Sequence, residues 1–260
     1  MFPRLLKLCI CWMAVAGWCC VFLPAAQAGV WFGTGVSPVN GDPLSASAEF
    51  ELSGSTLTIK LTNTSAQASG FVPSDGLSAL YFNVLNSPSL ALTTAGANAP
   101  TASKIWNGSS FSGPVILSTF PSPGASESPP YWSLAQSAAA LAATVPQHYG
   151  VGSAGLGIFG PGVGGLGFTI FPNGFNGSNG NSAVDTGPVA VDRTTLTITG
   201  FTGSLADISD VTFQYGTALD EGTITTRQVE STPEPASFVA WGLLTAFGAT
   251  LAWMRRHRAA

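Results

Sequence analysis

Few residues of this 260-residue chain have the chemistry and spacing that catalysis requires. Between residues 29 and 231 there is one histidine, His148, which a Ser-His-Asp triad would have to use as its base. The nucleophile-elbow pattern G-x-S-x-G fails at Ser153, because Val151 stands where its first glycine should be. Zinc usually takes several His or Cys ligands, so one histidine predicts no zinc site. We therefore expect a loop histidine and no catalytic residue.

Carboxylates of the C-terminal half could bind calcium or, as a pair, hydrolyse a glycosidic bond. They are Asp185, Asp192, Asp207, Asp210, Asp220 and Glu221. None follows an EF-hand or similar loop spacing, and nothing in their spacing selects an acid–base pair. We expect solvated turns and strand ends, and no metal ligand.

Glycine-rich residues match the dinucleotide pattern G-x-G-x-x-G three times, at 150–155, 155–160 and 162–167. A dinucleotide site needs this phrase between a strand and a helix, and no helical pattern follows it here. We predict no cofactor. Aromatic side chains could instead stack on sugars, and the candidates are Trp31, Trp106, Tyr131 and Trp132. Packing in the core or at turns is the commoner role for such residues, so sugar binding is the alternative.

Alternating hydrophobic residues identify the elements that would position these side chains. Within residues 46–61 hydrophobic residues alternate with polar ones on each side of Gly54, and this glycine predicts a hairpin turn or a bulge. Further strands are expected at 79–85, 114–117, 195–199 and 211–215, and one short helix at 132–144. The phrase Thr-Leu-Thr-Ile, at 56–59 and 195–198, indicates two strands in similar environments. Together these predict a mainly β fold, a β-sandwich with long Gly/Ser/Pro-rich loops.

The charge balance and the cysteine positions exclude some classes of partner and cross-link. Residues 29–232 carry four basic and twelve acidic residues, so this part of the chain is acidic and unsuited to nucleic acid. All four cysteines lie within the first 20 residues: Cys9, Cys11, Cys19 and Cys20. Because they precede the expected cleavage site, the mature protein has neither thiols nor disulfides.

Residues 1–28 are typical of a secretory signal peptide. Arg4 and Lys7 form a basic start, an apolar run follows, and Pro24 ends it. Ala26 and Ala28 then match the small-x-small rule for signal peptidase, so we expect cleavage after Ala28. An uncleaved N-terminal transmembrane helix is the alternative.

The C-terminal 29 residues, 232–260, form a second distinct segment. The motif Pro233, Glu234, Pro235, Ala236, Ser237 precedes an apolar run over 238–254. At roughly 1.5 Å per residue this run spans about 25 Å as a helix, close to the thickness of a bilayer core. The basic residues Arg255, Arg256 and Arg258 follow and should stay cytoplasmic. We predict one transmembrane helix, with residues 29–231 as the β-rich ectodomain.

In its motif, helix and arginine cluster, this tail resembles the PEP-CTERM sorting signal. The resemblance implies processing near Pro-Glu-Pro by an exosortase, in Gram-negative bacteria that make exopolysaccharide. More loosely, four ectodomain segments resemble a subgroup of exosortase-dependent surface proteins: 57–65, 73–82, 148–160 and 211–217. That subgroup carries no assigned catalytic residues. Where an aspartate commonly follows its aromatic pair, this chain has Asn83.

These patterns predict a non-enzymatic, structural protein of the cell surface or extracellular matrix. Its expected partners are signal peptidase, an exosortase, the inner membrane as a transient anchor, and exopolysaccharide as a candidate ligand. The alternatives are a carbohydrate-binding module and, less favoured, a secreted hydrolase.

Overall fold

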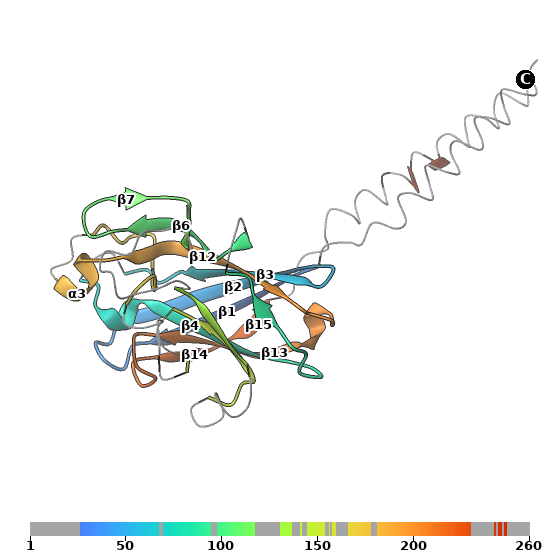
Figure 1. The fold of residues 1–260 in the computed structure, drawn as a ribbon, viewed down its shortest axis with the longest axis horizontal. Helices are drawn as coiled ribbons and strands as arrows, with labels where there is room; N and C mark the ends of the chain where they lie inside the picture. The colour runs from blue at the N-terminus through green and yellow to red at the C-terminus, as the bar shows by residue number, and fades with distance from the viewer. Residues whose placement is uncertain are drawn as a thin grey trace, which may run out of the picture. The chain divides into compact units, whose positions relative to one another are not determined.

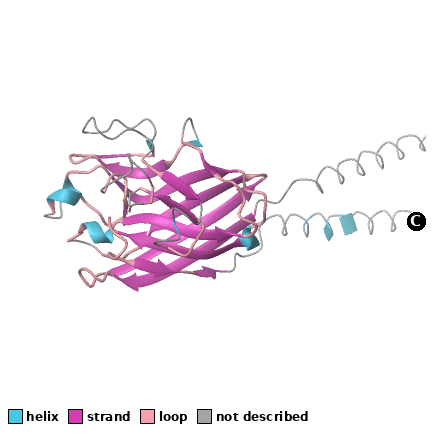
Figure 2. Ribbon diagram, turned by 60° about the horizontal axis from the view of Figure 1, so that its bottom comes forward, coloured by secondary structure: helices cyan, strands magenta, loops and turns pink. Residues whose placement is uncertain are grey.

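The computed structural model describes residues 27–67, 70–94, 98–117, 131–136, 141, 145–153, 156, 158–159, 166–177, 181–229, 242, 244–245 and 247–248. The chain divides into two compact units, one made of Met1–Gln27 with Thr232–Ala260, the other of Ala28–Ser231. Nearly all described residues lie in the second unit, which contains the sheet of Figures 1 and 2.

The second unit is mainly β, as the alternating sequence predicts. Its strands are β1 Gln27–Val36, β2 Pro43–Ser53, β3 Thr56–Asn63, β4 Leu77–Val84, β5 Ala91–Leu92, β6 Thr101–Trp106, β7 Phe111–Ser112, β8 Val115–Ile116, β9 Ser133–Gln136, β10 Tyr149–Gly152, β11 Ile170–Phe171, β12 Val189–Thr199, β13 Ile208–Tyr215, β14 Thr223–Thr225 and β15 Arg227–Val229. The described helices of this unit, other than the single residues Asn98, Leu117 and Leu141, are short: η1 Pro73–Asp75, α3 Ser182–Asp185 and η4 Leu205–Asp207.

The hairpin predicted over residues 46–61 is confirmed. β2 and β3 pair antiparallel from Ala46 opposite Asn63 to Ser53 opposite Thr56, and Gly54 at the turn has φ +60°. Along β3 every second residue is buried, beginning with Leu57, so one face of the hairpin packs into the core. The strands expected at 79–85, 114–117, 195–199 and 211–215 are present as β4, β8, part of β12 and part of β13.

The two Thr-Leu-Thr-Ile phrases form neighbouring strands that pair with each other. β12 runs antiparallel to β3, with Leu196 opposite Ile59 and Ile198 opposite Leu57. All four side chains are fully buried. The repeated phrase is therefore a cross-strand ladder of matched threonines and aliphatic residues.

The strands form two layers joined at both sides. The first layer runs β14-β13-β4-β10-β9, and the second runs β15-β1-β2-β3-β12-β6. β11 bridges them on one side, since Ile170 pairs with Leu77 of β4 and with Ala190 of β12. On the other side the chain crosses from β14 to β15 through one residue, Thr226. The two end strands of the sheet, β14 and β15, thereby lie next to each other.

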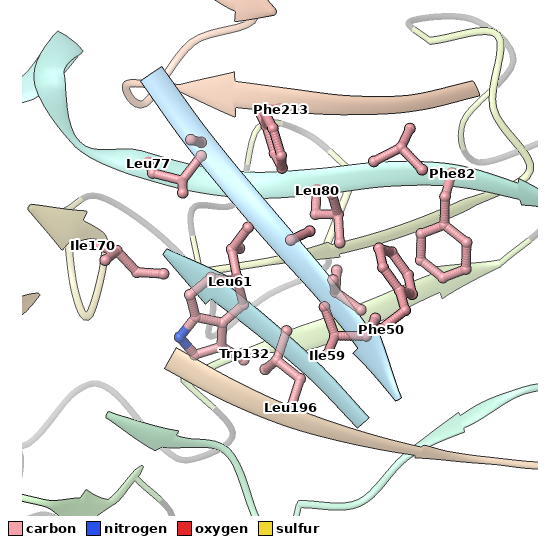
Figure 3. Packing of buried hydrophobic residues seen from close by; sticks show 14 of the residues in the cluster. Phe50, Ile59, Leu61, Leu77, Leu80, Phe82, Trp132, Ile170, Leu196 and Phe213 are labelled. Atoms are coloured by element: carbon pink, nitrogen blue, oxygen red, sulfur yellow. The ribbon is translucent and has the colours of Figure 1, made fainter. Parts of the chain in front are cut away.

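The main core lies between the two layers. Phe50 of β2 and Phe82 of β4 meet edge to face, with ring centroids 5.8 Å apart, although three strands separate β2 from β4 along the sheet. Trp31 of β1 packs on Phe50 with centroids 4.6 Å apart. Figure 3 shows aliphatic side chains from β3, β4, β11 and β12 meeting in the same space.

Two smaller clusters cover the outer faces of the layers. On the first layer, Tyr81 of β4 stacks on Phe159, with centroids 6.2 Å apart. On the second layer, Val189 and Val191 of β12 pack with a cluster of phenylalanines, Phe71, Phe171 and Phe175. These clusters thus bury a second face of β4 and of the start of β12, which explains why β4 and residues 189–191 are hydrophobic on both sides.

The prediction of a helix over residues 132–144 is wrong for the first part of this range. Ser133–Gln136 form β9, which pairs antiparallel with β10, Leu134 lying opposite Val151. Residues 137–140 and 142–144 fall outside the described residues. Alanine-rich helix propensity is a weak preference, and a ladder to a neighbouring strand overrides it. The short helix α3 lies instead at Ser182–Asp185, where the Asn181 side chain caps it by accepting from Ala183 N at 3.1 Å.

Candidate functional site

Most of the expected processing residues lie outside the described part of the chain. These are Ala26, Pro233, Glu234, Pro235, Ala236, Ser237, Arg255, Arg256 and Arg258. Within the expected membrane segment 238–254, Gly242, Leu244, Thr245, Phe247 and Gly248 are described, and all five are helical. No helix of the described residues has the length and apolar character needed to cross a membrane.

The strand that contains the expected signal-peptidase site pairs with the strand before the Pro-Glu-Pro motif. β1 and β15 are antiparallel, with Val30 opposite Val229, Trp31 opposite Gln228 and Phe32 opposite Arg227. The start of β1 and the end of β15 therefore lie side by side. We call this end, which also holds the Gly54–Ser55 turn and η4, the chain-end pole.

At the opposite end of the domain, the loop pole, described residues of three connections meet: 37–42, 64–67 with 70–76, and 216–222. Gly216 N donates to the Gly76 carbonyl at 2.8 Å, and Tyr215 Oη donates to the Ser45 carbonyl at 2.8 Å. Asn63 at the end of β3 donates to the carbonyls of Asp75 and Ile170, at 3.0 and 2.8 Å. The loop pole is thus a hydrogen-bonded assembly of segments from both layers.

The loop pole contains two carboxylates bridged by one amide, which sequence inspection did not single out. Asn40 Nδ2 donates to Asp42 Oδ2 at 2.6 Å and to Asp75 Oδ1 at 3.1 Å. Gln67 Nε2 donates to Asp42 Oδ2 at 2.8 Å, and Val72 N donates to Asp75 Oδ2 at 2.8 Å. We call Asn40, Asp42, Gln67 and Asp75 the amide–carboxylate cluster. In the sequence, only the turn residues Asn40-Gly41-Asp42 and Pro73-Ser74-Asp75 point to this cluster. Such residues predict loops, and they do not predict a binding site.

Burial raises the pKa of Asp75 above its usual 3.8, and the charge of Asp42 adds to this effect. The hydrogen bonds from Val72 and Asn40 act in the opposite direction by stabilising the carboxylate. Asp75 is fully buried, so its carboxylate depends on these donors. The cluster thus surrounds the two carboxylates with side-chain and backbone donors inside the loop pole.

The Phe-Gln-Tyr-Gly-Thr segment forms a second hydrogen-bonded motif at the same pole. Buried Gln214 donates through Nε2 to the carbonyls of Tyr215 and Ala218, at 2.8 and 3.1 Å, and accepts from Thr223 Oγ1 at 2.9 Å. Glu221 accepts from the backbone N–H groups of Thr217 and Ala218. These residues close the β13–β14 connection, so the segment has a structural role.

The aromatic candidates for sugar stacking pack mainly against protein. Trp31, Tyr131 and Trp132 are buried. Trp106 is partly exposed, but Phe111 lies 4.9 Å away, and a Cβ on Gly177 would be 2.7 Å from its ring. Its Nε1 donates to the Asp185 carbonyl at 2.7 Å. The packing role expected as the commoner one therefore holds for the three buried residues, and Trp106 is covered on part of its ring.

The glycines of the first dinucleotide-like match make room for aromatic rings. A Cβ on Gly150 would lie 2.7 Å from Tyr81 Cδ1, and one on Gly152 would overlap the Phe159 ring. Both glycines lie in β10, and Tyr81 and Phe159 stack against them. Close packing accounts for this pair without a nucleotide.

Of the remaining candidates, His148 and Asp210 both bond to Asn83, whereas Ser153 and Asp207 bond to other groups. His148 is exposed, and its backbone N donates to Asn83 Oδ1 at 2.8 Å. Ser153 Oγ donates to the Ser78 carbonyl at 3.2 Å. Asp207 accepts from Ser204 N at 2.6 Å, and Asp210 from Asn83 Nδ2 at 2.9 Å. Across the described residues, no three His, Cys, Asp or Glu side chains gather closely enough to hold a metal ion.

Comparison of the chain with protein-family models, with curated proteins and with solved structures gave no match. The resemblance of the tail to the PEP-CTERM signal accordingly rests on the motif residues themselves.

Proposed function

We propose that this chain is an exported component of the cell surface or extracellular matrix, with a structural, non-enzymatic role. Signal peptidase removes residues 1–28, and the helix over 238–254 anchors the protein transiently in the inner membrane. An exosortase then processes it at Pro233-Glu234-Pro235. In this proposal the sheet is a β-sandwich ectodomain, and exopolysaccharide is its candidate ligand.

The pairing of β1 with β15 carries the proposal. Val30 and Val229 face each other, so the sheet is completed between the two expected processing points. Cleavage after Ala28 and near Pro235 would remove Gln27 and Ala28 from the start of β1 and leave the three β1–β15 residue pairs in place. A domain that loses both terminal segments without losing a strand suits a protein that is processed at both ends.

The candidate residues also favour a structural role over the alternatives. The phrases around Asn63 and Gln214 hold loops together, and three of the four aromatic candidates are buried. A carbohydrate-binding module usually presents aromatic faces to solvent, so the main support for that alternative is weakened.

The test is the intact mass of the protein recovered from the surface of cells that carry an exosortase. We expect the wild-type chain to begin at Gly29 and to end near Pro235. A Pro233→Ala/Glu234→Ala variant should keep its C-terminal helix and stay in the membrane fraction. Thr232→Ala, next to the motif, is the matched control and should be processed like the wild type.

Recovery of a wild-type chain that still ends at Ala260 would contradict the sorting step. The protein would then be a membrane-anchored domain. Retention of residues 1–28 in that chain would contradict the signal-peptide assignment separately.

A further inference from the structure

The bond expected to be cut by signal peptidase, Ala28–Gly29, lies inside a strand of the folded domain. We propose that closure of β15 on β1 shields this bond, so that signal peptidase must act before the sheet closes. This rests on the proposed function, which assigns residues 1–28 as a cleaved signal. What it adds is an order of events, hydrolysis first and closure second.

Burial of Gly29 is the first observation. β1 begins at Gln27, so both residues of the bond belong to it. Gly29 is buried: a Cβ placed there would lie 2.8 Å from Trp31 Cζ3 and 3.6 Å from Leu205 Cδ1. An aromatic ring of the same strand and a leucine of η4 therefore enclose the residue that becomes the new N-terminus.

The second observation is that both edges of β1 are occupied. β2 neighbours β1 on one edge, and β15 pairs with it on the other, beginning at Val30. An extended peptide is commonly gripped through the same backbone N–H and C=O groups that a neighbouring strand uses. Because β15 already pairs with β1 at Val30, Trp31 and Phe32, a protease cannot take hold of the product side of the bond.

Hydrolysis adds one water across the bond between the Ala28 carbonyl carbon and the Gly29 nitrogen. It releases a carboxylate on Ala28 and an ammonium group on Gly29. The nucleophile must reach the Ala28 carbonyl while the flanking backbone lies extended in the enzyme. In the closed domain this requires β1 to leave the sheet.

Because the chain is exported from its N-terminus, there is a period in which signal peptidase can reach the Ala28–Gly29 bond. β15 is the last of the described strands, so its edge of β1 stays unpaired until residues 227–229 have been exported. The β15 ladder is also short and formed by exposed residues, Arg227, Gln228 and Val229. It is the part of the shield that a substitution can remove most selectively.

The experiment uses the full-length precursor and purified signal peptidase in detergent micelles. One sample is diluted from denaturant straight into the enzyme, and the other refolds fully before the enzyme is added. We expect the refolded precursor to be cleaved at least about tenfold more slowly, followed by mass as the product beginning at Gly29. Equal rates would overturn the shielding. Failure of both samples to release that product would overturn the signal-peptide assignment and the inference with it.

Two proline variants test whether β15 is the shield. Alternate residues of an antiparallel strand donate to its neighbour, so Gln228→Pro and Val229→Pro between them remove a ladder hydrogen bond whichever set donates. The variant that removes it should restore rapid cleavage of the refolded precursor. Thr202→Pro, in an exposed loop outside both strands, is the control and should stay resistant. Resistance of both β15 variants, with circular dichroism showing a folded domain, would overturn the role of β15.

Discussion

At the residue scale, most polar side chains that could have been functional satisfy backbone groups. The side chains of Asn63, Gln214 and Glu221 each form hydrogen bonds with main-chain groups at the loop pole. A buried polar group without a partner costs roughly 1–3 kcal/mol, so these contacts hold the loops in place. The amide–carboxylate cluster differs, because there one side-chain amide joins two acids.

The first prediction concerns Asp75 and pH. Its raised pKa means that the folded protein holds this proton more tightly than the unfolded chain does. The stability it contributes is complete below the usual value of 3.8 and is lost as pH rises through the raised folded value. Asp75→Asn cannot ionise, so relative to wild type its stability should improve between pH 3.5 and pH 7. Urea unfolding of both proteins at the two pH values measures this change.

A wild-type advantage that grows toward neutral pH would contradict the assignment of Asp75. The comparison of the two proteins at each pH cancels the titration of every other carboxylate. The difference therefore reports Asp75 and its immediate partners.

At the element scale, residue alternation predicted the strands well and their partners poorly. The hairpin over 46–61 can be predicted from the sequence because its turn and its alternation of hydrophobic and polar residues involve only nearby residues. By contrast, β9 was expected to be helical, since its pairing with β10 comes from residues about 15 positions away. The amide–carboxylate cluster joins Asn40 to Asp75 across 35 residues, and no local pattern marks such a contact.

The pairing of the two Thr-Leu-Thr-Ile phrases gives a prediction for one ladder. Ile59→Ala and Leu196→Ala should each destabilise the domain by about 2–5 kcal/mol, because both side chains are fully buried. As direct cross-strand partners they should be coupled, so the double variant should depart from additivity by at least about 0.5 kcal/mol. Chemical unfolding of the four proteins completes the cycle.

Val184 provides the control for this cycle, because it belongs to a different hydrophobic cluster. Ile59→Ala with Val184→Ala should be additive within about 0.5 kcal/mol. Equal coupling in both pairs would mean that the effect is not specific to the ladder.

At the scale of the whole molecule, the domain is a sheet whose two ends meet. β14 and β15 are separated only by Thr226, which donates through Oγ1 to the Val211 carbonyl at 2.9 Å. Gly33 of β1 lies where the layers converge, and a Cβ there would be 2.7 Å from Ile224 Cγ2. The composition predicted a mainly β domain, but this closure depends on the β1–β15 register, which only the three-dimensional structure provides.

Circular permutation tests this closure. Val30 and Val229 are opposite each other, with Cα atoms about 5 Å apart, so a linker of about four residues can join Val229 to Gly29. New ends at the Gly54–Ser55 turn should leave a folded domain whose Tm lies within about 5 °C of the original. Thermal melts followed by circular dichroism measure it. The matched permutant, opened between Thr195 and Leu196 inside β12, should not fold.

The β1–β15 ladder also determines how the protein would respond to force. Its two outward-leading ends, at Val30 and Val229, lie at the same end of the ladder. Tension between them would break the three residue pairs one after another, as in a zipper, instead of straining all of them together. A molecule tethered only through its C-terminus carries no tension across the β1–β15 ladder. A molecule held at both ends would separate first at the β1–β15 ladder, at low force, while the β3–β12 ladder stayed intact.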